Sequence, residues 1–312
     1  MTSNSNKSLY KKIFFDALRI RKIEEKIIEL YPFDKIQSPV HLSIGQESVA
    51  VSLCNNLNKK DVIFINYRGH SFYLAKGGPL NKFFAELYGK QTGISKGKAG
   101  SMHLSCKDKG VMGASAVVAS TISHAVGFSL ADKIRNNFKV VVSIFGDGAT
   151  EQGVFHESLN FASLYKVPLI FLCENNKLAV HASLSERQSY KISSIVKSYK
   201  IEYFYIKNSF DLLNTFKKFQ AIISNFRKNP RPIFIEVETF RYKEHVGPND
   251  DFDAGYRTFS EFNQWLKKDP LYYDKALIKK FSKKIDNEIE IAIKFAENSN
   301  FPNSSELLKD VL

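Results

Sequence analysis

Cysteine is scarce in this sequence, and long apolar runs are missing from it. The three cysteines, Cys54, Cys106 and Cys173, are scattered and show no paired spacing, so neither a disulfide framework nor a cysteine metal centre is predicted. No apolar run approaches the roughly 20 residues of a membrane span. The polar amino terminus leads into a predicted helix rather than into the core of a signal peptide. We therefore expect a cytoplasmic protein with reduced thiols and no membrane partner.

Acidic residues are too few to balance the basic ones, and the formal net charge is +13. Such a charge raises the alternative of a nucleic-acid partner. The basic residues, however, are spread over predicted helices as lysine pairs such as Lys11-Lys12 and Lys279-Lys280, and no nucleic-acid-binding module accompanies them. With 44% hydrophobic and 25% charged residues, the composition is that of a soluble globular protein. We therefore interpret the lysines as a solvated surface and expect no nucleic-acid partner.

Strand-like and helical segments alternate along the chain. Strands are predicted at residues 61–66, 140–145, 169–173, 201–206 and 233–237, and helices at 8–30, 116–135, 153–166 and 210–226. The last fifty residues are also helical and amphipathic. No repeat or flexible linker separates these parts. The pattern predicts an α/β fold in which residues 1–312 form one domain, with a parallel sheet and helices on both faces.

Two turns in the middle of the chain carry the strongest functional signal. Residues 146–148 read Gly-Asp-Gly and residues 174–176 read Glu-Asn-Asn, and each turn follows a predicted strand. One helix lies between them, so the two strands should be parallel neighbours with their carboxyl ends at the same edge. Asp147 and Asn176 are therefore expected to lie close together, at the edge where α/β folds bind ligands.

The oxygen atoms of these turns suit a hard divalent cation. The Asp147 carboxylate, the Asn176 amide oxygen and a nearby backbone carbonyl are ligands of the kind that Mg²⁺ takes, and they leave positions for phosphate oxygens. Gly146 and Gly148 let the backbone approach a diphosphate closely. For the first turn alone, an ordinary strand-to-helix turn with Asp147 as a cap is the alternative. The second turn, at the matching position, favours the metal site.

Three polar side chains in other segments could meet an anion at the same edge. Arg68 closes the strand at 61–66, and its guanidinium could form a fork with a terminal phosphate. A structural salt bridge is the alternative for this arginine. His41 and His245 lie in predicted loops and could bind an anion or donate a proton, although a loop histidine is usually only solvated.

A glycine-rich stretch at residues 93–113 is too long for a simple connection and suits a binding loop. Within it, residues 110–113 read Gly-Val-Met-Gly. This segment could bring backbone amides and carbonyls to a ring system, and a plain turn is the alternative. The stretch from Asn176 to about residue 200 is rich in Ser, Lys and His, and it is predicted to be a mobile active-site loop with a short helix.

Taken together, these segments resemble the alpha subunit of the decarboxylating component of 2-oxo-acid dehydrogenases, such as pyruvate and acetoin dehydrogenase. The two turns, from Gly146 to Asn176, are similar to the thiamine diphosphate signature of that family. Further similar segments run in the same order along the whole chain, at residues 41–47, 67–70, 97–103, 146–153, 240–242, 256–257, 269–270, 295–297 and 301–302.

The resemblance implies a thiamine diphosphate-binding fold and a site for the cofactor with Mg²⁺. The implied metal ligands are Asp147, Asn176 and the backbone carbonyl of Leu178. The implied diphosphate contacts are Tyr67, Arg68, Gly148, Ala149 and His245. Gly110 and Met112 would lie against the aminopyrimidine ring, and His41 would line the pocket. His245 also matches the histidine that steers proton transfers in the family, so it is the catalytic candidate.

By the same resemblance, the enzyme decarboxylates a 2-oxo acid and passes the acyl group to lipoamide. The glutamate that activates the cofactor belongs to a separate beta subunit in this family. The implied assembly is a heterotetramer of two alpha and two beta subunits, with a lipoyl acyltransferase as a further candidate partner. Two alternatives stay open: a carboligase that transfers the acyl group to an aldehyde or keto-sugar, and a non-catalytic scaffold subunit.

Two segments depart from the commonest pattern of the family. Residues 243–246 read Lys-Glu-His-Val where His-Gly-His-Ser is usual, so the serine that is phosphorylated in some relatives is absent at that position. Residues 177–179 read Lys-Leu-Ala where an arginine–aromatic–glycine step or a similar one is usual. Both changes alter the expected pocket wall, and they leave the 2-oxo acid and the acyl acceptor open.

Overall fold

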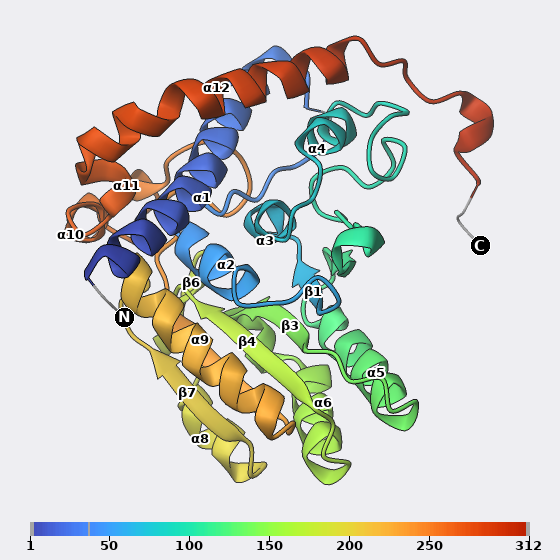
Figure 1. Cartoon of the computed structure of the whole chain (residues 1–312), viewed down its shortest axis with the longest axis vertical. Coiled ribbons are helices and arrows are strands. Elements are labelled where there is room, and N and C mark those ends of the chain that lie inside the picture. Colours follow the sequence, from blue (N-terminus) through green and yellow to red (C-terminus); the bar gives the residue numbers. More distant parts are fainter. Residues whose placement is uncertain (1–2, 37, 310–312) are drawn as a thin grey trace.

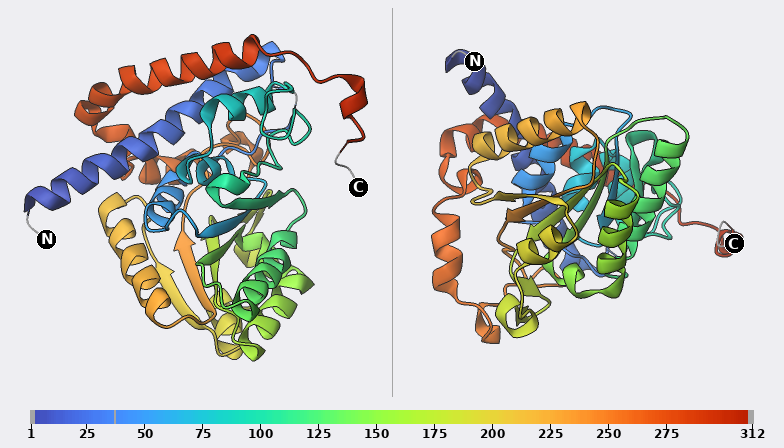
Figure 2. Two further views of the ribbon diagram at one scale, coloured as in Figure 1. Left: turned by 45° about the vertical axis from the view of Figure 1, so that its right-hand side comes forward. Right: turned by 90° about the horizontal axis from the view of Figure 1, so that it is seen from below.

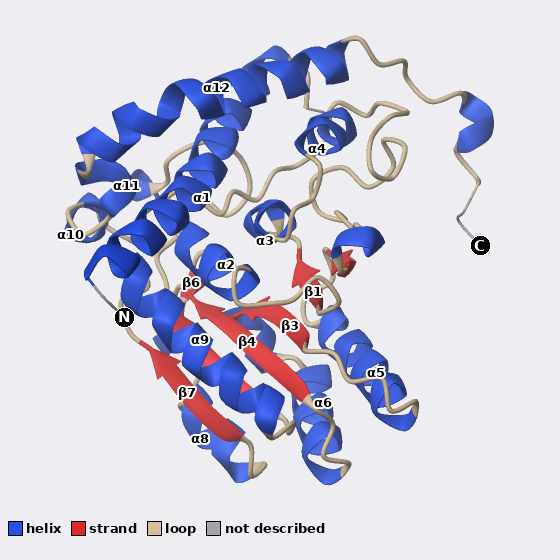
Figure 3. Ribbon diagram, viewed as in Figure 1, coloured by secondary structure: helices blue, strands red, loops and turns tan. Residues whose placement is uncertain are grey.

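The chain folds around a six-stranded parallel sheet (Figure 1; Figure 3). The structure is a computed structural model, and it describes residues 3–36 and 38–309. The strand order in the sheet is β2-β1-β3-β4-β8-β7, and every pairing in it is parallel. The strands are β1 (Val62–Asn66), β2 (Val111–Ser115), β3 (Val141–Gly146), β4 (Leu169–Asn175), β7 (Glu202–Ile206) and β8 (Ile233–Glu238). The predicted α/β fold with a parallel sheet is confirmed.

Helices cover both faces of this sheet, and the long helix α12 (Lys275–Glu297) crosses α1 (Ser3–Leu30) at one side of the molecule, beyond the sheet (Figure 1). A short hairpin of strands β5 (Leu178–Ala179) and β6 (Ala182–Ser183) follows β4. The helices are α1 (Ser3–Leu30), α2 (Glu47–Cys54), α3 (His70–Ala75), α4 (Leu80–Leu87), α5 (Ser120–Ile134), α6 (Gly153–Leu164), α7 (Leu184–Arg187), α8 (Ile192–Ser198), α9 (Leu212–Lys228), α10 (Phe259–Leu266), α11 (Pro270–Tyr273) and α12 (Lys275–Glu297).

Each face of the sheet carries its own hydrophobic core, because successive strand residues point to opposite faces. Ile63, Val142 and Ile144 belong to the core beneath α2 and α9. Phe64 and Phe145 belong to the core beneath α5, α6 and α8. The view from below shows the sheet between these two helical layers (Figure 2). Both faces are buried, which explains why the central strands read as nearly continuous apolar runs.

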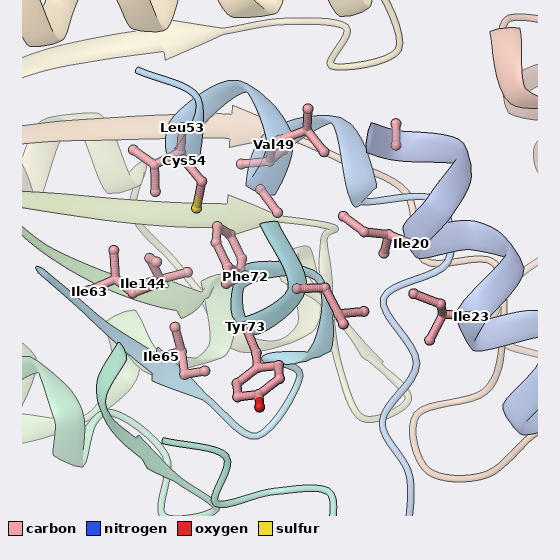
Figure 4. Close-up of a cluster of buried hydrophobic side chains, with 14 of the residues drawn as sticks. Ile20, Ile23, Val49, Leu53, Cys54, Ile63, Ile65, Phe72, Tyr73 and Ile144 are labelled. Atoms are coloured by element: carbon pink, nitrogen blue, oxygen red, sulfur yellow. The ribbon is translucent and has the colours of Figure 1, made fainter. Parts of the chain in front are cut away.

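The first core continues away from the sheet into the amino-terminal helices. Ile20 and Ile23 of α1 pack in the same cluster as Val49 of α2 and Phe72 of α3 (Figure 4). Each of these side chains is at most 1% exposed, and such burial is worth about 1.5–3 kcal/mol per large apolar side chain. Through this packing, α1 and α2 hold the loop before Glu47 over the carboxyl edge of the sheet.

The largest departure from the predicted elements is strand β2, at the edge of the sheet. Residues 111–115 read Val-Met-Gly-Ala-Ser, without the alternation or branched side chains that indicate a strand. Pairing with β1 nevertheless makes them a strand, which begins within the segment 93–113 predicted to be an irregular loop. As a result, the following helix begins at Ser120 rather than at residue 116.

The segment after Asn176 contains more regular structure than a loop and one helix. It holds the β5–β6 hairpin, α7 and α8. The three cysteines are buried and free of disulfides, as predicted. In the described part of the chain, no helix is both long and apolar enough to cross a membrane.

Candidate functional site

A cleft of about 330 Å³ lies at the carboxyl ends of β1, β3 and β4. The two turns meet there because β3 and β4 are parallel neighbours, with Gly146 paired to Glu174. The expected closeness of Asp147 and Asn176 follows from this pairing. The predicted site residues that line the cleft are His41, Tyr67, Arg68, Asp147, Gly148, Ala149, Asn176, Leu178 and His245.

Asp147 presents one carboxylate oxygen without a partner to this cleft. It opens the short 3-10 helix η3 (Asp147–Glu151), and it is 1% exposed. Its Oδ2 lies 2.5 Å from Nη2 of Arg187, whereas its Oδ1 has no hydrogen-bond partner among the described residues. Burial raises the pKa of the carboxyl, and the Arg187 guanidinium, followed by the nearby backbone amides of Asp147 and Asn176, opposes that shift. A buried carboxylate oxygen without a donor fits a cation ligand.

The backbone around Asn176 and Leu178 folds back toward Asp147. The Asn176 side-chain oxygen accepts a hydrogen bond from the Leu178 amide at 3.1 Å, which curls the chain into the β5–β6 hairpin. A Cβ at Gly148 would lie 2.9 Å from the Cβ of Ala179, so glycine allows the hairpin to approach η3 closely. The oxygen atoms that could ligate a metal ion here are thus one carboxylate, one amide oxygen and backbone carbonyls.

These oxygen ligands suit Mg²⁺ better than a softer metal ion. Within residues 3–36 and 38–309, no group of three or more His, Cys, Asp or Glu side chains is arranged to hold a metal ion. A cation in the cleft would therefore rely on amide, backbone and external oxygens beside the Asp147 carboxylate. Diphosphate oxygens would complete such a set, and the residues present fit a metal–diphosphate group.

Arg68 adds a positive charge to the lining of the cleft. This side chain is 5% exposed, and it donates hydrogen bonds to the backbone oxygens of Leu42 at 2.7 Å and His245 at 3.1 Å. Burial lowers the pKa of Arg68 to about 10, with a further contribution from Arg241. The guanidinium therefore stays protonated at neutral pH. An anion in the cleft would therefore meet a fixed positive charge at Arg68.

His41 and His245 form an aromatic group with Tyr67 beside this arginine. The His41 ring centroid lies 4.5 Å from that of Tyr67 and 5.2 Å from that of His245. Burial, followed by the charge of Arg68, lowers the pKa of each histidine to about 3. Both imidazoles are therefore neutral at neutral pH.

The tautomer of His245 follows from its neighbours. Its Nδ1 lies 3.3 Å from a guanidinium nitrogen of Arg68 and 3.5 Å from one of Arg241. Guanidinium groups only donate hydrogen bonds, so Nδ1 accepts and the single ring proton resides on Nε2. A neutral imidazole with a defined N–H can donate a hydrogen bond to a bound substrate from Nε2.

Gly110 and Met112 are not brought to this cleft. They line a separate cavity with Val62 and Phe128. The reason lies in the register of β2, because Ser115 pairs with Asn66 at the carboxyl edge and Gly110 precedes the strand at the opposite edge. The residues that follow β2 reach the cleft instead, and these are Ala116, Val118, Ala119 and Thr121. The carboxyl-end rule would have found them if β2 had been recognised as a strand.

Sequence reasoning also missed Gln46 and Glu174 as cleft residues. Glu174 is 2% exposed, and burial raises its pKa to about 8. Gln46 accepts a hydrogen bond from the Asn176 amide at 3.3 Å, so it helps to orient that side chain. The available signal was an acidic residue at the end of the apolar strand β4.

Comparison with known proteins identifies the family to which this cleft belongs. The sequence profile described as "Dehydrogenase E1 component" matches residues 16–305. The chain belongs to that family. Subunit alpha of acetoin:2,6-dichlorophenolindophenol oxidoreductase from Bacillus subtilis (strain 168) is 33% identical over 309 residues, covering 94% of this chain and 90% of the relative.

Two pyruvate dehydrogenase E1 component alpha subunits are similarly related to this E1-family chain. The protein from Rickettsia bellii (strain RML369-C) is 30% identical, with 98% of this chain and 96% of the relative covered. The protein from Rhizobium meliloti (strain 1021) is 32% identical, with 96% and 89% covered. The predicted alpha subunit of a thiamine diphosphate-dependent 2-oxo-acid dehydrogenase is therefore confirmed at the level of the family.

Proposed function

We propose that this alpha subunit supplies the metal-binding and diphosphate-binding half of an active site that decarboxylates a 2-oxo acid and passes the acyl group to lipoamide. The observation that carries the proposal is the partnerless, buried Oδ1 of Asp147 at the edge that Asn176 and Leu178 share. Arg68 and His245 stand in the same cleft. A scaffold subunit has no need for such a set.

The residues divide into two binding groups. Asp147, Asn176 and the Leu178 carbonyl would hold Mg²⁺, and Tyr67, Arg68, Gly148, Ala149 and His245 would contact the diphosphate. His41 lines the pocket beside Tyr67. Because Ala116 and Val118 occupy the cleft wall, we assign to them the place beside the ring system that was expected for Gly110 and Met112. Thiamine diphosphate, when bound, supplies the electron sink that decarboxylation of a 2-oxo acid requires.

His245 is the proposed catalytic residue of this chain. Its low pKa keeps it neutral, and the guanidinium groups of Arg68 and Arg241 hold its proton on Nε2. That N–H can donate a hydrogen bond to a substrate oxygen and so orient the substrate. The two arginines hold the ring in place, because a flip of the imidazole would point its N–H at guanidinium N–H groups, which cannot accept a hydrogen bond.

The proposed partners follow from the place of the chain in its family. A beta subunit would supply the glutamate that activates the cofactor, in an assembly of two alpha and two beta subunits. The relatives are named for pyruvate and for acetoin, so both compounds are candidate substrates. A lipoyl acyltransferase is the proposed acceptor of the acyl group. The predicted cytoplasmic location stays a prediction.

The decisive experiment uses the purified complex with the beta subunit. With Mg²⁺ and thiamine diphosphate, we expect CO₂ release from one member of a panel of 2-oxo acids that includes pyruvate, with acetoin tested by dye reduction. Asp147→Ala should abolish the activity and the rise in melting temperature that metal and cofactor cause, because the carboxylate ligand is gone. The exposed Asp253→Ala serves as the control and should behave like the wild type. Wild-type activity of Asp147→Ala would contradict the proposal.

A carboligase is the second candidate, and the substitutions at residues 243–246 and 177–179 favour testing it. Leu178 and Ala179 line the cleft, and Lys243, Glu244 and Val246 flank the cleft residue His245, so a different acyl acceptor would meet these changes. Reductive acylation of a lipoyl domain supports the dehydrogenase. CO₂ release that yields only a carbon–carbon coupling product supports the carboligase.

A further inference from the structure

Arg187 is a charged residue that contacts the cleft residues Asp147 and Glu151, and the proposed function assigns no task to it. It ends helix α7, 40 residues after Asp147 in the sequence. Nevertheless, its Nη2 lies 2.5 Å from Oδ2 of Asp147, and its side chain is only 10% exposed. A buried arginine in direct contact with a candidate metal ligand calls for a physical explanation.

Three acceptors fix the Arg187 guanidinium in place. Nε donates to the backbone oxygen of Ala182 at 3.1 Å, within the hairpin that follows Asn176. Nη1 forms a short ion pair with Glu151, at the end of η3. Nη2 binds Asp147, at the start of η3. Gln188 adds a hydrogen bond to the same Glu151 oxygen at 2.8 Å. The guanidinium therefore bridges the hairpin–α7 segment and both ends of η3.

As a consequence, the two carboxylate oxygens of Asp147 differ in their hydrogen-bond partners. Oδ2 is engaged by Arg187, and Oδ1 has no partner in the described part of the chain. A carboxylate that ligates a metal through one oxygen is commonly held by a hydrogen bond through the other. Arg187 therefore leaves the free oxygen available while preventing the carboxylate from turning.

The charges of the group remain suited to a cation. Arg187 carries one positive charge, whereas Asp147 and Glu151 as carboxylates carry two negative charges between them. The net charge of the three side chains is then negative, so the arginine does not cancel the attraction for a divalent ion. Glu151 thus allows a cation to bind next to a buried guanidinium.

We propose that Arg187 is a positioning residue for the metal ligand, holding Asp147 so that Oδ1 is presented to Mg²⁺. Through the Ala182 contact, the same residue couples the hairpin–α7 segment to the metal site. This inference rests on the proposed function, because it requires a divalent cation at Asp147. It predicts a specific defect in metal affinity rather than a loss of the cofactor pocket.

The test is a metal titration of the alpha–beta complex at saturating thiamine diphosphate. The half-saturating Mg²⁺ concentration is taken from the rise in melting temperature, and Mn²⁺ binding is measured directly by electron paramagnetic resonance. Arg187→Gln should raise the half-saturating concentration by about 10–100-fold, the usual loss when an outer partner of a metal ligand is removed. At saturating metal, the affinity for thiamine diphosphate should stay within about twofold of the wild type, because the diphosphate contacts are intact.

Two further variants separate the charge of Arg187 from the geometry of its guanidinium and provide a control. Arg187→Lys keeps the charge but not the fork, so it should restore part of the metal affinity. Arg231→Gln removes a surface arginine that pairs with Glu202 on β7, and it should leave the metal titration unchanged. If Arg187→Gln does not fold, as judged by its melting in the absence of metal, Arg187→Lys alone decides, with an expected rise of about 3–10-fold.

The outcomes separate this inference from the function on which it rests. An unchanged half-saturating Mg²⁺ concentration in the Arg187 variants would overturn the inference alone. A lowered concentration would also overturn it, because Arg187 would then be a competitor of the metal. By contrast, a wild-type complex that binds Mn²⁺ no better than Asp147→Ala would remove the proposed function as well.

Discussion

At the residue scale, Val180 shows that the cleft wall contains backbone strain. Its φ of 55° lies in the left-handed region, where a β-branched residue is an outlier. Its carbonyl accepts hydrogen bonds at 3.3 Å from both terminal nitrogens of Arg241, and Arg241 is itself buried against Asp251. These contacts hold an unfavourable conformation at a functional site. Sequence patterns gave no indication of this strain, because it depends on an arginine 61 residues away.

We expect Val180→Asn to raise the free energy of unfolding by about 1 kcal/mol, because asparagine tolerates the left-handed region far better than valine. Urea denaturation of the alpha subunit measures the difference. Val246→Asn is the matched control, since Val246 is 41% exposed, compared with 47% for Val180, and has no positive φ. Equal effects of the two substitutions would contradict the strain argument.

At the element scale, a buried ionic group joins three helices behind the cleft. Arg21 of α1 donates to Glu47, the first residue of α2, and to Asp269, the N-cap of α11, at 2.9 Å. Burial raises the pKa of Glu47 to about 7, against the effect of Arg21. Glu47 also accepts a hydrogen bond from the Gly45 amide, so the group fixes the loop that carries His41.

Arg21→Ala should therefore cost about 3–5 kcal/mol of stability, because two carboxyl groups would lose their buried partner. The control is Arg19→Ala on the same helix, whose partner Glu288 is 41% exposed in its side chain. That substitution should cost only about 0–1 kcal/mol. Chemical denaturation measures the free energy of unfolding of both variants. A similar decrease in each would contradict the larger contribution expected from the buried ionic group.

Elements could be predicted from the sequence wherever the local pattern agreed with the tertiary context. The β3–α6–β4 unit was found because its strands are uninterrupted apolar runs and a single helix connects them. Strand β2 was missed, since glycine and small residues hide its pattern and only pairing with β1 makes it a strand. The misplacement of Gly110 and Met112 follows from that one omission.

At the scale of the whole molecule, the buried His41 and the partly buried His245 make stability depend on pH. The pKa values of His41 and His245 are lowered from 6.5 to about 3 by burial first and by Arg68 second. Between these values the unfolded chain binds more protons than the folded one, so stability decreases as pH falls through this window. The contribution is complete above about pH 6.5, where both states carry neutral imidazoles.

Replacing one of these histidines should flatten the acid side of the stability curve. We expect the stability of His245→Asn relative to the wild type to improve between pH 7 and pH 5, by up to about 1.4 kcal/mol per pH unit. Urea denaturation at pH 7, 6 and 5 provides the measurement. For His124→Asn, at an exposed position on α5, the curve of stability against pH should be parallel to that of the wild type. The prediction fails if the stability–pH curve of His245→Asn is also parallel to that of the wild type.

The organisation of the described residues, 3–36 and 38–309, supports the proposal that the chain forms one domain. The two hydrophobic cores lie on opposite faces of one sheet, and α1 and α12 pack on each other although they come from the two ends of the chain. Contacts between such distant segments cannot be read from local patterns. The amphipathic periodicity of both helices predicted that each buries a face, but not which partner it meets.

The amino-acid sequence by itself determined the family and the chemistry of the principal turns. Asp147 and Asn176 were predictable as neighbours because strand–helix–strand connections obey a general geometric rule. Only the tertiary structure decided that Ala116 and Val118, rather than Gly110 and Met112, reach the cleft, because strand register sets the edge to which each residue belongs. It alone placed Arg187 on Asp147, because that contact joins a hairpin and a turn 40 residues apart through packing that no local pattern encodes.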